Sequence, residues 1–333
     1  MSDTPDEMNL LGSQPVRVLE ANVLAWFEDK YPDFRQELEA IGVHLVLSRR
    51  IKYYCDEAPI LAHDHEHHMI PYIDRSGQIG LHETFMSYVW ALSYSFMVIF
   101  DEGFHGPKID KPHGHGYPLG HFLSRGYSTL NYGLKLLHEF QPWPESLPSP
   151  EQCSEEDQYY VTRANGIYVC AADFILCHEV AHAACGHLAN QSEAATRGEI
   201  LPNHEIRVME HEADQWALSH VIKGIREERS RTMVGFGAIA GLGALLFLKS
   251  EITSSTHPDT DDRMISVLNT LCSDSRDNLW GVAATFFIAW TFGFEKGLDL
   301  PTECDTYEAL FQEIVGLLTH LKRQEDLRRF GLD

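Results

Sequence analysis

Apolar side chains recur at helical spacing along most of this chain, and alternation with polar residues is confined to a short stretch. Residues 1–15 are polar and acidic, so we expect them to be disordered. A helical pattern follows over about 16–40. The stretch 42–55 is rich in β-branched and aromatic side chains, which predicts one or two strands. The apolar stretch 81–100 predicts a buried helix, so the pattern indicates a mainly α fold with a small β-sheet (α+β).

A proline-rich break divides the pattern into two parts. Four prolines lie within residues 141–150, and we place a domain boundary there. The predicted N-terminal region, 16–150, is helical and β with histidine-rich loops, and the predicted C-terminal domain, 151–333, is helical. Ser154–Asp157 resembles a capping box, so a long helix should run from there towards His187. Further helices are predicted over 203–229, 259–271 and 306–330.

Two apolar runs, 233–248 and 279–294, are rich in glycine and alanine. Each is shorter than the roughly 20 residues that span a bilayer. We therefore expect buried core helices at both places, with membrane contact as the alternative.

Composition excludes some classes of protein. The chain has 333 residues, 44% of them hydrophobic, which is enough for a sizeable core. A net charge of -23 without a dense lysine and arginine cluster disfavours nucleic acid and leaves a protein or peptide as the expected partner. The seven cysteines show no C-x-x-C pair, and the N-terminus shows no positive patch followed by an apolar run. These features predict a cytoplasmic protein with reduced thiols; the oligomeric state is left open.

The strongest chemical motif lies in the long predicted helix. His178 and His182 are four residues apart, so their imidazoles project from one helical face and can share a metal ion. Glu179 follows His178 by about 100° around the helix, which suits a general base acting on a water molecule beside the metal. Cys177 and Cys185 flank this H-E-x-x-H motif and are expected to be small core residues, and His187 is expected at a C-terminal helix cap.

A catalytic zinc ion needs a third protein ligand. Glu210 and Asp214 are again four residues apart, so Glu210 can reach the metal while Asp214 accepts the second ring N–H of a ligand histidine. Glu212 is a competing third ligand and His211 a weaker one. The alternative is an exposed acidic helix, which is common in so negative a chain.

These residues resemble the gluzincin zinc metallopeptidases, which carry H-E-x-x-H on one helix and E-x-x-x-D on the next. Thr256-His257-Pro258 with Arg263 resembles the T-H-P-x-x-x-x-R element of the HtpX and CAAX-prenyl-protease type. The short gap between His182 and Glu210 is closer to the ImmA/IrrE type, and the phage-exclusion peptidase Lit is a further group sharing H-E-x-x-H. The resemblance implies a zincin-like metallopeptidase core, Zn2+ as cofactor, and His257 and Arg263 as oxyanion donors. Alternatively, Thr256–Pro258 only begins a helix, with His257 near its cap.

We therefore expect a zinc-dependent endopeptidase that cleaves an intracellular protein, with a regulatory or defence role. By the resemblance, the peptide would lie extended against a strand edge, which the stretch 42–55 could supply. One alternative is a non-catalytic zinc-binding sensor or scaffold, with the histidine tract 63–68 as a second metal binder. The other is a membrane-associated protease that uses the two apolar runs.

Overall fold

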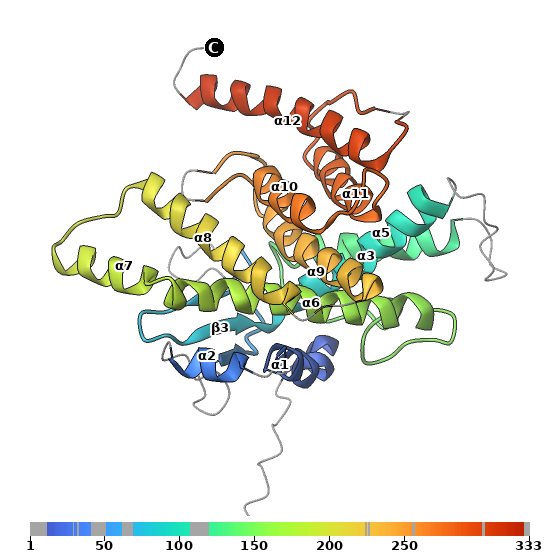
Figure 1. Cartoon of the computed structure of the whole chain (residues 1–333). Helices are drawn as coiled ribbons and strands as arrows, with labels where there is room; N and C mark the ends of the chain where they lie inside the picture. The colour runs from blue at the N-terminus through green and yellow to red at the C-terminus, as the bar shows by residue number, and fades with distance from the viewer. Residues whose placement is uncertain are drawn as a thin grey trace, which may run out of the picture.

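The protein is mainly helical and is built around one long central helix. The computed structural model describes residues 12–28, 30–31, 33–40, 51–61, 69–106, 120–223, 225, 227–254, 257–301 and 304–329. Figure 1 shows helix α6 crossing the middle of the molecule, with α8 to α12 on one side and α1, α2 and the sheet on the other. The helices are η1 (Pro15–Leu19), α1 (Glu20–Glu28), α2 (Phe34–Ala40), α3 (Glu83–Val98), the π-helix η2 (Ile99–His105), α5 (His121–Lys135), α6 (Gln158–Ala184), α7 (His187–Thr196), α8 (Asn203–Ile222), α9 (Glu228–Leu246), α10 (Thr260–Leu271), α11 (Asn278–Gly293) and α12 (Tyr307–Arg329).

One small sheet accompanies the helices. Its strands β1 (Ile51–Tyr54), β2 (Tyr72–Ile73) and β3 (Ile79–His82) lie in the order β1-β3-β2. β3 pairs in parallel with β1 and antiparallel with β2, so β2 is an edge strand. The expected mainly α fold with a small sheet is confirmed. The strand predicted within 42–55 is present at 51–54, while 42–50 lie outside the described residues.

α6 is buried because it is apolar on nearly every face, as expected of a helix at the centre of a core. It packs against α1, α3, α8 and α9. Its predicted start is close to the observed one, since Ser154 Oγ accepts the Asp157 N–H at 3.2 Å just before the helix begins. Gly237 of α9 explains the glycines of the apolar run, because a Cβ there would lie 2.7 Å from the backbone of Cys170. The missing side chain lets the two helices approach closely.

The apolar runs 233–248 and 279–294 lie largely within α9 and α11, and many of their side chains belong to the hydrophobic core. Among the described residues, one helix, α6, is long and apolar enough to cross a membrane, and 78% of its apolar window is buried inside the protein. α3 packs on α6 across the proline-rich break, so both parts share one core. The domain boundary at 141–150 stays a prediction.

Candidate functional site

Three side chains from two helices meet at one point. His178 and His182 come from α6 and Glu210 comes from α8, which packs across it. The Nε2 atoms of the two histidines lie 3.3 Å apart. The Glu210 carboxylate lies 3.2 Å from Nε2 of His178 and 3.7 Å from Nε2 of His182. The side chains are only 10–12% exposed. These three donor atoms are close enough to hold one metal ion.

The orientation of His178 is fixed by a buried ion pair behind it. Asp214 Oδ1 lies 3.0 Å from Nδ1 of His178, the ring nitrogen that faces away from Glu210. Arg263 of α10 donates Nε–H and NH2 to the two oxygens of Asp214, both at 2.6 Å. Asp214 therefore lies where the sequence placed it, one helical turn beyond Glu210, and Arg263 contacts it rather than pointing freely into the site.

The charges of the site are strongly coupled. Burial alone would lower the pKa of His178, but hydrogen bonds to Asp214 and Glu210 outweigh it and raise that pKa to about 10. Burial would raise the pKa of Glu210, but the imidazolium of His178 lowers it to about 2. Burial also opposes the low pKa of Asp214, which Arg263 and His178 hold well below its usual range. In the metal-free protein a proton on His178 thus faces Glu210, where a divalent cation would be held.

Burial lowers the pKa of His182 to about 4, so this imidazole is neutral at physiological pH and its lone pair is available to a cation.

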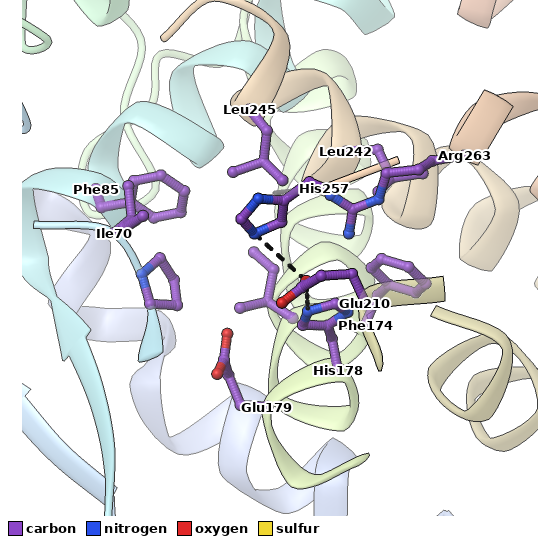
Figure 2. A pocket seen from close by; sticks show the side chains of 13 residues that line it. Ile70, Phe85, Phe174, His178, Glu179, Glu210, Leu242, Leu245, His257 and Arg263 are labelled. Carbon is purple, nitrogen blue, oxygen red and sulfur yellow. Dashed lines mark ion pairs between the residues drawn. The ribbon is translucent and has the colours of Figure 1, made fainter. Parts of the chain in front are cut away.

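Glu179 lies beside these donors in a cavity of about 90 Å³. Figure 2 shows its carboxylate apart from the Glu210 and His257 pair, across the cavity. Burial raises the pKa of Glu179 to about 7, and the backbone N–H of Ile73, in edge strand β2, donates to its carboxylate. A carboxyl group with a pKa near neutrality suits proton transfer in either direction. The apolar lining of the cavity consists of Ile70, Pro71, Phe85, Phe174, Ile175, Gly241, Leu242 and Leu245.

His257 reaches the same cavity from the loop before α10. Its Nε2 lies 3.4 Å from Oε2 of Glu210, and its side chain is 47% exposed. Thr256 lies outside the described residues, and Asp259 is the residue at the N-cap of α10, so His257 precedes the cap by two positions. Both expectations for this segment are compatible with its position: it introduces a helix, and it brings His257 to the site.

Helix α12 holds that loop in place. Lys322 lies 3.0 Å from Asp259 and 2.6 Å from Asp261. Glu325 accepts the backbone N–H groups of Ile252 and Thr253, both at 3.3 Å. The ammonium group of Lys322 therefore offsets part of the negative charge of the carboxylates at the start of α10.

Several sequence expectations need adjustment. Glu212 and His211 are exposed and lie outside the group of donors that could share one ion, so Glu210 is the carboxylate that joins the histidines. Cys177 is buried as expected, but the expectation for Cys185 was wrong: α6 ends at Ala184, and Cys185 is exposed in the turn that follows. The histidine tract 63–68 lies outside the described residues.

Sequence reasoning missed the contacts of His187 and of strand β2. Gly186 has φ of +77°, so it ends α6 as the expected cap. His187 then begins α7, is buried, and its Nδ1 lies 3.0 Å from Nδ1 of His182. The sequence signal for this contact was a histidine directly after a capping glycine, since such a glycine turns the next residue back towards the end of the helix. The two residues of β2 are too few to leave an alternating pattern.

Comparison with known proteins assigns the chain to a family of peptidases. The pattern of the peptidase U49 family matches residues 79–283, which is more than half of the chain and includes the candidate site residues from His178 to Arg263. The protein therefore belongs to this family of peptidases, the Lit-like group among those that the sequence resembled. It is 26% identical over 200 residues to the cell death peptidase of Escherichia coli (strain K12). That alignment covers 58% of this chain and 63% of the relative, less than two thirds of the relative's length. No solved structure matches the chain.

Proposed function

We propose that this protein is a zinc-dependent endopeptidase that hydrolyses peptide bonds of an intracellular protein. The observation that carries the proposal is the meeting of His178, His182 and Glu210 at one point, with the carboxylate of Glu179 beside them in a cavity. Membership of a peptidase family supports peptide-bond hydrolysis as the reaction, since a peptidase acts on a protein or peptide. The chemistry of the site residues supports zinc as the metal.

The donor set fits zinc. Two imidazoles and one carboxylate are the ligands of many catalytic zinc sites, in which the fourth position stays open to water or substrate. Asp214 beside His178 provides the carboxylate–histidine contact that orients such a ligand and raises its basicity. The proton that now faces Glu210 from His178 would be released on binding, because a metal and a proton compete for the same ring nitrogen.

In the proposed mechanism, bound zinc would supply Lewis acidity, polarising the scissile carbonyl and lowering the pKa of water. Glu179 takes a proton from the attacking water and passes it to the leaving amine, which its pKa near 7 suits. The Ile73 N–H holds the Glu179 carboxylate in place. His257 lies at the exposed side of Glu210, where it can donate to the oxygen of the tetrahedral intermediate. The two bonds of Arg263 to Asp214 favour a positioning role for Arg263 over the oxyanion role expected from sequence.

The structure suggests where a substrate chain would lie. β2 is the edge strand next to α6, and Ile70 and Pro71 just before it line the cavity. An extended peptide can add to such an edge through main-chain hydrogen bonds. We therefore propose β2, in place of the stretch 42–55, as the substrate-binding strand. The name of the E. coli relative, cell death peptidase, supports a regulatory or defence role. A cytoplasmic location belongs to the same proposal.

Replacing Glu179 with Gln tests the mechanism. The amide keeps the size of the side chain but cannot take a proton, so hydrolysis should fall by about 10²- to 10⁴-fold while zinc stays bound. Cut sites should be mapped by mass spectrometry in a host lysate, with metal content measured on the same preparations. Full activity in Glu179→Gln would remove the assigned base. Zinc bound to a wild-type protein that cuts nothing in the lysate would instead favour a zinc-binding protein without catalysis.

A matched pair of variants tests the third ligand. Glu210→Ala should lose zinc, whereas Glu212→Ala, two positions along the same helix and exposed, should retain a stoichiometric ion. Loss of zinc from Glu212→Ala with none from Glu210→Ala would reverse the assignment.

A further inference from the structure

We infer that His187 is a positioning residue of this site, which fixes the ring of His182 through a hydrogen bond between their Nδ1 atoms. The inference rests on the proposed function, because it concerns how a zinc ligand is held. His187 does not itself approach the cation position.

The hydrogen bonds determine the tautomers. Nε2 of His182 faces His178 and Glu210, so its lone pair is directed to the cation and its ring proton is on Nδ1. That proton is donated to Nδ1 of His187 at 3.0 Å, which must then be the unprotonated nitrogen. The remaining proton of His187 is on Nε2, 3.0 Å from Oε2 of Glu212. The contacts thus form one chain from the cation position through two imidazoles to a carboxylate.

The fold builds this chain from three helices. The left-handed conformation of Gly186 turns the polypeptide at the end of α6, so that the first residue of α7 folds back on the last turn of α6. The His187 side chain is 2% exposed, and its ring meets that of His182 at an interplanar angle of 68°. Glu212 of α8 closes the chain at the surface, with its side chain 55% exposed. A buried histidine whose two nitrogens are both engaged has little freedom to turn.

The two ligand histidines therefore differ in support. His178 donates to a buried carboxylate held by Arg263, whereas His182 donates to a buried neutral imidazole. Removing the acceptor at position 187 would leave the buried Nδ1–H of His182 without its partner. The His182 ring would then be less firmly oriented, and Nε2 would be a weaker metal ligand. Loss of such a supporting partner lowers metal affinity by about 10- to 100-fold. Glu212 is exposed enough for water to replace it, so its removal should have a smaller effect.

Three substitutions at position 187 separate hydrogen bonding from packing. The Oδ1 atom of Asn occupies nearly the place of Nδ1 in histidine, so His187→Asn keeps the acceptor, while the longer His187→Gln places its oxygen near Nε2 instead. His187→Phe fills the space without any acceptor. Zinc affinity should be measured by competition with a chromophoric chelator, and the visible spectrum of the cobalt-substituted protein should be recorded for each.

We expect His187→Phe and His187→Gln to bind zinc about 10- to 100-fold more weakly than wild type, with shifted cobalt bands, and His187→Asn to stay within about threefold. Wild-type affinity and an unchanged cobalt spectrum in His187→Gln would overturn the inference. Equal losses in the Asn and Gln variants would also overturn it, since packing alone would then explain them. Wild-type protein that binds no zinc would instead refute the proposed function, and this inference with it.

Discussion

The buried pair between Arg263 and Asp214 gives a quantitative test of how the site is held. The side chains are 5% and 9% exposed, and two hydrogen bonds of 2.6 Å join them. Arg263→Met removes the charge and keeps an unbranched chain in place of the aliphatic part of arginine. It leaves the Asp214 carboxylate buried with His178 as its remaining partner.

Removing one partner of a buried ion pair destabilises a protein by about 3–5 kcal/mol. The imidazolium of His178 compensates part of the charge in the metal-free protein, which places the expected loss at the low end, about 3 kcal/mol. A typical domain has about 5–15 kcal/mol of stability, so the variant should still fold. Its zinc affinity should fall as well, because Asp214 no longer orients His178 firmly.

Urea unfolding of the metal-free protein measures the first effect, and chelator competition measures the second. A cycle with Asp214→Asn supplies the control: the double variant carries neither charge and should recover at least about 1 kcal/mol relative to Arg263→Met. Additive losses in that cycle would refute the pair as a coupled unit. Unchanged stability and zinc affinity with a large fall in kcat would refute the positioning role and restore Arg263 as an oxyanion donor.

Two further predictions concern the core. Gly237→Ala should destabilise the protein by about 3 kcal/mol or more, because the new Cβ would lie 2.7 Å from the backbone of Cys170. Gly316→Ala in α12 should instead stabilise the protein by about 0.5–1 kcal/mol, because no atom lies within 4 Å of the new Cβ. The urea midpoints of both variants check the contrast, and equal midpoints would contradict the close approach of α6 and α9. Burial raises the pKa of Asp173 from 3.8 to about 6, even though the ammonium of Lys30 lies beside it. The folded chain therefore keeps the proton of Asp173 to a higher pH than the unfolded chain does. As a result, the contribution of Asp173 to the free energy of unfolding falls as the pH rises from about 4 to about 6. Lys30→Met should extend this loss of stability to higher pH, because the carboxyl group of Asp173 then has no ammonium beside it. Urea midpoints of wild type and variant at pH 5 and pH 7.5 measure the effect. A difference between the two proteins that is the same at both pH values would contradict the prediction.

The arrangement of side chains within each helix could be predicted from the sequence. Residues four apart share a helical face whatever surrounds the helix, so the pairs His178 with His182 and Glu210 with Asp214 follow from spacing alone. The same holds for the position of Glu179 beside His178. The apolar character of α6, α9 and α11 likewise predicts their burial from the sequence alone, and the core contains all three helices.

Contacts between elements depend on packing, which local spacing does not encode. Nothing in the pattern around α8 states which of its faces meets α6, so Glu210 and Glu212 were both candidates until the helix crossing placed one inside and the other in solvent. Packing of α10 on α8 joined Arg263 to Asp214, and the turn at Gly186 brought His187 against His182. Strand β2 exists because it pairs with β3 and contacts α6, and two residues carry no periodicity of their own. The sequence by itself thus determined which donors each helix presents, and the tertiary structure decided which of them meet, because long-range packing sets the distances between helices while the spacing of residues sets only the geometry within one.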